Sequence, residues 1–312
     1  MGRPKNIIVV NQEYRTLAES FYRYLLRLGY NPKSCKSRYN YLCEFLSQLE
    51  QKGMLDITQI TVQEISNYYE YISERPSKKD GGILSQKTTH SHMRIIRDLF
   101  IMLQNNGVTK TNPCSTLKFH YPRETAERTI LGQEEIEILY KVSETAQECA
   151  ILSLAYGCGL RVGELVNCNI EDIRLREKIL IVPKGKGNKR RIVPISSGVV
   201  KDLTDYYYKE REPLTKGRDY NPKESAFMLN SRGGRMNKWT YNKILKQLLK
   251  RTEIPQEKQD RLSLHNLRHS IATHLLEQGI PVEQVRMFLG HSQLETTQIY
   301  THISRKQLQN LM

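Results

Sequence analysis

The sequence predicts a mainly helical protein of two domains, the second of which contains a small antiparallel β-sheet. Apolar residues recur at helical spacing over most of the first 120 residues. A polar segment without periodicity, 118–129, then interrupts the pattern and contains Pro122. Only the later part of the chain has two short β-rich runs separated by a glycine-containing turn. We therefore expect a helical domain at 1–120, a linker at 121–128 and an α+β domain at 129–312.

Four helices are expected in the first domain. The first ends before Gly29, the second spans 32–52, and the third begins at Thr61, whose spacing to Glu64 is that of a capping box. The fourth covers 85–106, after a polar loop at 77–82. The apolar positions that should face a shared core are Tyr14, Leu17, Phe21, Leu25 and Leu28; Leu42, Cys43, Leu46 and Leu49; and Met93, Ile96, Phe100 and Leu103. These patterns predict a four-helix bundle.

Basic residues occupy the polar faces of two of these helices. Lys36 and Arg38 fall on the second helix and Lys87 and Arg94 on the fourth, interleaved with Ser, Thr and His. Such mixtures suit contacts with phosphates and base edges. An ordinary solvated helix face is the alternative interpretation.

The second domain is expected to begin with helical sequence at 132–158 and to continue with a β-hairpin, 178–183 and 191–195. The tip between the strands has the sequence K-G-K-G-N-K-R, so Lys184, Lys186, Lys189 and Arg190 project from a backbone that glycine lets follow a groove. Helices are predicted again at 239–250, 265–278 and 281–289, and a last helix carries Tyr300.

Composition and charge narrow the class of protein. The net charge of +15 is shared by both parts, because residues 1–125 hold 18 basic and 11 acidic residues and the remainder 30 and 22. Positive surfaces on both domains suit a polyanionic partner, although a solvated surface is the alternative.

Six cysteines without a C-x-x-C pair favour reduced thiols in the core. Without a signal peptide or an apolar run that could span a bilayer, we expect a cytoplasmic protein that does not enter membranes.

The segment 265–269, with the sequence H-N-L-R-H, combines two histidines and an arginine that could serve in catalysis or ligand binding. His265 and Arg268 are three residues apart and should project from one face of a helix. His265 and His269 have the four-residue spacing of a zinc pair, but Asn266 stands where the metalloprotease pattern requires Glu, so no metal site is predicted. In isolation this segment is also compatible with a capping or core histidine and a surface arginine.

Four stretches together resemble the tyrosine recombinase family, and most of all the Xer recombinases. These are A-Y-G-C-G-L-R-V-G-E-L at 155–165, G-K-G-N-K-R-R-I-V-P-I at 185–195, L-S-L-H-N-L-R-H-S-I-A-T-H-L-L at 262–276 and L-G-H-S-Q-L-E-T-T-Q-I-Y-T-H at 289–302. The resemblance covers about 129–312, and the first domain resembles the core-binding domain of that family by pattern. The family's catalytic positions match Arg161, Lys186, His265, Arg268, His291 and Tyr300, and its supporting positions match Glu164 and His269.

The chemistry of strand transfer accounts for this set. Two guanidiniums, Arg161 and Arg268, would stabilise the charge that develops on the nonbridging oxygens of a phosphodiester. A phenol with a pKa of about 10 needs a base, for which His265 is suited, and Lys186 could protonate the departing sugar oxygen. His291 could donate to a phosphate oxygen.

The resemblance implies site-specific recombination through a 3′-phosphotyrosyl intermediate and a four-way junction. It further implies four protomers on two double-stranded DNA sites, either all copies of this chain or this chain together with a related recombinase, and no cofactor. The absence of a P-loop motif or a carboxylate cluster is consistent with that chemistry. Two alternatives are a catalytically silent DNA-binding regulator and a type IB topoisomerase. A recombinase that had become a silent regulator should have lost at least one of the six catalytic side chains, and none is missing. The four stretches are more similar in sequence to the recombinases than to type IB topoisomerases.

Overall fold

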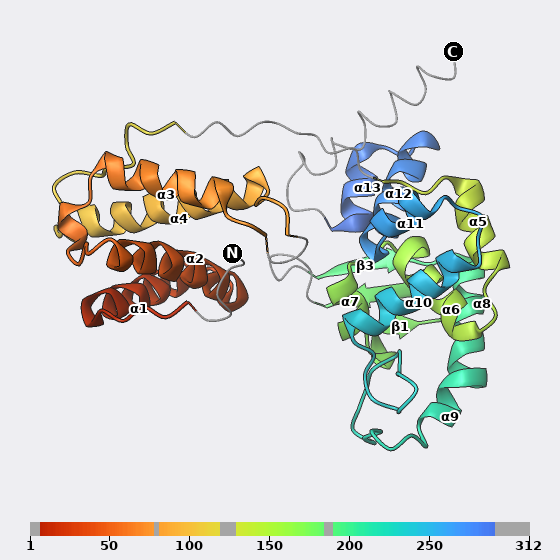
Figure 1. Ribbon diagram of the computed structural model, residues 1–312. Coiled ribbons are helices and arrows are strands. Elements are labelled where there is room, and N and C mark those ends of the chain that lie inside the picture. Colours follow the sequence, from red (N-terminus) through yellow and green to blue (C-terminus); the bar gives the residue numbers. More distant parts are fainter. Residues whose placement is uncertain (1–6, 78–80, 119–128, 184–189, 291–312) are drawn as a thin grey trace, which may run out of the picture. The chain divides into compact units, whose positions relative to one another are not determined.

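The computed structural model describes residues 7–77, 81–118, 129–183 and 190–290 (Figure 1). The chain divides into two compact units, 1–125 and 126–312. Mainly helical structure with one small antiparallel sheet confirms the predicted fold class. Among the described helices, none has the length and apolar character needed to cross a membrane.

The first unit is a bundle of four helices. They are α1 Gln12–Arg27, α2 Pro32–Gln51, α3 Val62–Glu74 and α4 Gln86–Asn105, with a short 3-10 turn at Ile57–Gln59. Local side chains define where they begin, since Thr61 and Glu64 form the predicted capping box at the start of α3. The helices enclose one apolar core.

The predicted core of the bundle is correct with one clear exception. Leu28 is 56% exposed. It follows the last residue of α1, where Gly29 has a φ of 80° and turns the chain away from the helix axis. The row of buried apolar residues on α1 therefore ends at Leu25, one turn before Leu28. Leu17 lies at the edge of this row and is only partly buried.

The second unit begins with α5 Gln133–Lys141 and α6 Ala146–Leu152, which lie in the stretch expected to be helical, 132–158. A π-helical turn at Ser153–Gly157 and the short helix α7 Val162–Asn167 follow. The sheet has the order β1-β2-β3, formed by Ile173–Arg174, Ile179–Val182 and Arg191–Pro194. The predicted hairpin corresponds to β2 and β3, whose register pairs Leu180 with Val193 on the buried face. The first strand, β1, was not predicted.

Helices surround this sheet. After β3 the chain forms α8 Ser197–Asp205, a π-helical turn at Tyr206–Arg211 and α9 Glu212–Leu214, none of which the sequence pattern had indicated. It continues with α10 Lys238–Lys250, α11 Gln256–Arg261, α12 Leu264–Glu277 and α13 Val282–Leu289. Helix α13 contacts both β3 and α12, and Figure 1 shows it beside α12.

Candidate active site

The site is organised around one buried carboxylate, that of Glu164. Arg161 stands immediately before the first turn of α7, and Glu164 lies three residues later, so its carboxylate accepts a hydrogen bond from the Arg161 main-chain N–H at 2.9 Å. An acidic side chain in this position also interacts favourably with the positive end of the helix dipole. Local sequence thus places the carboxylate at the start of α7, where side chains from other elements reach it.

Three guanidiniums converge on this carboxylate. Arg161 donates to it at 2.8 Å, and Arg191, from β3, forms a two-pronged contact at 2.8 and 2.9 Å. Arg268, from α12, lies 3.7 Å away. Burial alone would raise the pKa of Glu164, but the hydrogen bonds and charge of Arg191, reinforced by Arg161, lower that pKa to about 2. The cluster therefore carries three positive charges against one negative charge.

The arginines also bind main-chain carbonyls of neighbouring segments. Arg268 donates to the carbonyls of Gly159 and Leu289 and is almost completely buried. Arg161 donates to the carbonyl of Gly290 at 3.1 Å, and its side chain stays 22% exposed. The excess of positive charge and the exposure of Arg161 make this a place where an anion such as a phosphate could bind.

His265 lies near this cluster, in the first turn of α12 and at the surface. Removal of water from around the imidazole, together with the positive charges of Arg268 and Arg161, lowers its pKa. A histidine with a lowered pKa is neutral at neutral pH and can accept a proton. His269 is half-buried one turn further along the same helix.

Several predicted residues fall outside the part of the chain that the structure describes. They are Lys184, Lys186, Lys189, His291 and Tyr300. Arg190 is described and exposed, and it directly precedes β3. Within the described residues, no group of three His, Cys, Asp or Glu side chains could hold a metal ion.

The four basic residues predicted on the bundle lie on α2 and α4. Lys87 and Arg94 are exposed, and the exposed Lys36 places its ammonium 4.9 Å from the centre of the Tyr39 ring. Arg38 differs, because its guanidinium lies over the Tyr30 ring and pairs with Asp98 at 3.4 Å. The positive charge of Arg38 is thus partly compensated by Asp98 within the bundle.

Sequence reasoning missed Arg191, which contacts the Glu164 carboxylate more fully than either predicted arginine. The only available signal was its presence in the second family-like stretch, 185–195, where K-R-R at 189–191 makes it look like one more cation of the hairpin tip. Its partners are 27 and 97 residues away, so no local spacing indicates them.

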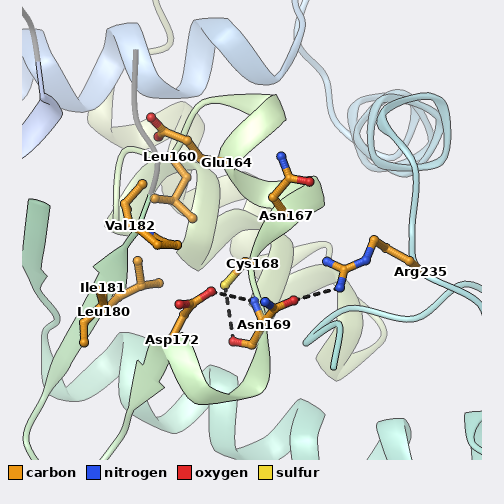
Figure 2. A pocket seen from close by; sticks show the side chains of 11 residues that line it. Leu160, Glu164, Asn167, Cys168, Asn169, Asp172, Leu180, Ile181, Val182 and Arg235 are labelled. Carbon is orange, nitrogen blue, oxygen red and sulfur yellow. Dashed lines mark hydrogen bonds between the residues drawn. The ribbon is translucent and has the colours of Figure 1, made fainter. Parts of the chain in front are cut away.

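A cavity of about 530 Å³ lies beside the cluster, between α7 and β2. Glu164, Asp172 and Arg235 are among the residues that line it; Figure 2 shows Glu164 at the upper left, Asp172 below it and Arg235 to the right. Arg235 is held by Asn169 at 2.7 Å and by Glu224 at 2.6 Å. Glu164 therefore belongs both to the arginine cluster and to the lining of this cavity, and the cation of that lining, Arg235, is already paired.

Comparisons with known proteins find matches for both units of the chain. The model of the phage integrase family matches residues 129–307, and that of the phage integrase SAM-like domain matches residues 16–120. The chain is 28% identical to tyrosine recombinase XerC of Oceanobacillus iheyensis over 297 residues, which cover 93% of this chain and 92% of that protein. It is 33% identical to tyrosine recombinase XerD of the same organism over 238 residues, or 75% and 76% of the two chains.

Solved structures show the same fold. The crystal structure of XerA recombinase is 25% identical, with a TM-score of 0.51 over 95% of this chain and 97% of that one. XerH site-specific recombinase, solved on a palindromic difH substrate as a post-cleavage complex, is 18% identical, with a TM-score of 0.71 over 100% and 98% of the two chains.

Proposed function

The chain belongs to the phage integrase family and is a tyrosine-type site-specific DNA recombinase, and we propose that it cuts and rejoins DNA through Tyr300. The observation that best supports this mechanism is the gathering of Arg161, Arg268 and Arg191 around Glu164. Arg161 and Arg268 come from elements more than a hundred residues apart, as the hydrogen bond of Arg268 to Gly159 illustrates. A cluster with net positive charge, built from distant segments, is suited to stabilise the negative charge that develops on a phosphate in the transition state.

In this proposal Arg161 and Arg268 stabilise the attacked phosphate. In-line displacement adds negative charge to the nonbridging oxygens, and guanidiniums that are already oriented stabilise that charge without reorganising. Glu164 orients the two arginines by accepting from Arg161 and by its charge beside Arg268. The partial exposure of Arg161 leaves it open to a phosphate that approaches from solvent.

Proton transfers complete the step. The phenolic oxygen of Tyr300 forms a bond to phosphorus as the bond from phosphorus to the 5′ oxygen breaks, and the 3′ phosphate remains attached to the enzyme. His265 takes the phenol proton, which its lowered pKa permits at neutral pH. Lys186 supplies the proton to the 5′ oxygen, and His291 donates to a nonbridging oxygen. The phosphotyrosyl bond conserves the energy of the broken bond, so rejoining requires no cofactor.

Exchange between two sites requires more than one active subunit. We propose that four protomers, either all copies of this chain or this chain together with a related recombinase, hold two double-stranded DNA sites and pass strands through a four-way junction. Each protomer would contact DNA with residues 1–120 and 129–312, connected by 121–128. The bundle would use Lys36, Arg38, Lys87 and Arg94, and the hairpin would use Lys184, Lys189 and Arg190. Positive charge on both parts of the chain supports this division.

Covalent capture tests the proposed chemistry. The chain is incubated with a library of labelled duplexes that have a randomised central segment and a nick in one strand, because loss of the short nicked fragment prevents rejoining. Covalent complexes are isolated under denaturing conditions, and the attached DNA is sequenced to define a captured duplex. Parent protein should form an adduct, whereas Tyr300→Phe should bind the captured duplex with unchanged affinity and form none. An undiminished adduct with Tyr300→Phe would show that another residue is the nucleophile.

A further inference from the structure

The C-terminal end of α13 is held by three arginines at three successive carbonyl groups. Arg191 donates from its Nε to the carbonyl of Phe288 at 3.0 Å. Arg268 donates to the next carbonyl, that of Leu289, and Arg161 donates to that of Gly290. The last carbonyls of a helix lack partners within the helix and carry its partial negative charge, so they are natural acceptors for guanidiniums.

Gly290 makes the closest of these approaches possible. Its φ of 65° lies in the left-handed region, which a side chain would disfavour. A Cβ atom at this position would also lie 2.8 Å from Cδ and 3.1 Å from Nη1 of Arg191. The side chain of Arg191 therefore lies directly against the main chain of Gly290, and both features exclude a larger residue.

Arg191 differs from the partly exposed Arg161 in what its donors contact. All three of its guanidinium nitrogens have partners, since Nε contacts Phe288 and both Nη atoms contact Glu164. Its side chain is only 8% exposed, against 22% for Arg161, and is thus about as buried as that of Arg268, which is 4% exposed. This geometry is that of a connector between α7 and the end of α13, with its charge directed inward.

We propose that Arg191 is a positioning residue, which fixes the end of α13 relative to Arg161 and Arg268 and so sets the point from which the chain continues to Tyr300. The proposal rests on the assignment of Tyr300 as nucleophile. Arg191 would not touch the phosphate but would determine where the nucleophile is delivered. A displacement of about 1 Å in a reacting group can cost about a hundredfold in rate, so a single clamp at this point has a large effect.

The test compares Arg191→Ala and Arg191→Lys with the parent on the captured duplex. Arg174→Ala is the matched control, because Arg174 lies on β1 of the same sheet and is half-exposed in an ion pair with Glu177. Affinity, melting temperature and the rate of adduct formation at saturating protein are measured. Both Arg191 variants should bind DNA like the parent but form the adduct about a hundredfold more slowly. Lysine should not restore the rate, because an ammonium cannot make the two-pronged contact and also reach Phe288.

A second substrate separates positioning from contact with the phosphate. It is the captured duplex with an uncharged methylphosphonate at the scissile position, which reduces the need for positive charge on the nonbridging oxygens. Arg161→Ala and Arg268→Ala should cleave this substrate better, relative to the normal phosphate, than the parent does. Arg191→Ala should gain nothing. Relief of the Arg191→Ala defect by the methylphosphonate would overturn the proposal, because it would place Arg191 on the phosphate.

Gly290→Ala provides an independent perturbation that keeps every charge. It should slow adduct formation in the parent, and it should slow it less in the Arg191→Ala background, where the clash is absent and only the strain of the positive φ remains. This variant and Arg191→Lys decide the question if Arg191→Ala does not fold. Rates within about threefold of the parent for the folded variants, well short of the cost of misplacement, would refute the positioning role. If the parent itself formed no adduct, the proposed function would fail instead.

Discussion

Replacement of Glu164 by Gln should remove a large, pH-dependent part of the stability of the catalytic unit. The amide has nearly the same shape as the carboxylate, so packing is retained while the negative charge is lost. The three guanidiniums of Arg161, Arg191 and Arg268 would then lie close together with no counter-charge from this position. Since the Glu164 side chain is only 6% exposed, solvent screens little of this effect.

The magnitude follows from the pKa of Glu164. Its pKa is lowered from an ordinary value of 4.5 to about 2 in the folded chain. Each unit corresponds to 1.36 kcal/mol, so the charged carboxylate stabilises the fold by about 3 kcal/mol. Because the folded pKa is the lower one, this contribution is complete above the unfolded pKa and is lost as the pH falls from about 5 towards about 2.

The assay measures the free energy of unfolding by urea titration at a series of pH values, for the parent and for Glu164→Gln. The variant should be less stable by about 3 kcal/mol at pH 7, and the difference should disappear near pH 2. Glu177→Gln is the control, because Glu177 forms an exposed ion pair with Arg174 that should contribute less than about 1 kcal/mol. A difference between parent and Glu164→Gln that stays constant from pH 7 to pH 2 would refute the electrostatic account.

Three other predictions concern cleavage and binding of the captured duplex. Arg161→Lys and Arg268→Lys should each slow adduct formation about a hundredfold to a thousandfold, because an ammonium lacks the planar two-pronged donor; single-turnover rates within about threefold of the parent would make these arginines structural. The lowered pKa of His265 should keep adduct formation active at pH values below the ordinary histidine pKa of 6.5, with the rate falling once the pH drops below the lowered value. A rate-pH profile of His265→Gln should lack this acidic limb, and an unchanged limb would assign it to another group. Four cations of the bundle are replaced by Ala together: Lys36, Arg38, Lys87 and Arg94. This change should weaken DNA binding and reduce the slope of log affinity against log salt by at most about four units. An unchanged slope in a salt titration would mean that the bundle does not bind DNA.

The parts of the fold that the sequence predicted are those with local signals. The bundle helices follow from apolar periodicity and from caps such as Thr61 with Glu64, both of which act within a few residues. The hairpin follows from its two β-rich runs and its glycine-containing tip. By contrast, β1 has only two residues, too few for an alternating pattern, and the π-helical turn at Tyr206–Arg211 departs from the helical repeat.

The candidate site was predictable only in part for a related reason. Arg161, Glu164, His265 and Arg268 lie in segments whose local spacing and family resemblance can be recognised. The role of Arg191 depends on contacts with Glu164 and Phe288, which the fold alone brings to it. Spacing along the chain carries no record of such contacts.

The Glu164 cluster connects every described segment that leads to a proposed catalytic group. Helix α7 begins at Arg161, and α12 brings both Arg268 and the base His265. Strand β3, which supplies Arg191, follows the hairpin tip that contains the proposed acid, Lys186. The end of α13, held through its last carbonyls, precedes His291 and Tyr300 in the sequence. A single buried carboxylate can therefore hold the elements that carry Arg161, Arg268 and His265 in a fixed arrangement. Through Arg191 it also holds β3, which follows the tip with Lys186, and the end of α13, which precedes Tyr300 in the sequence. For that reason a change at Glu164, or at Arg191 in the same buried ion pair, should affect stability and cleavage together.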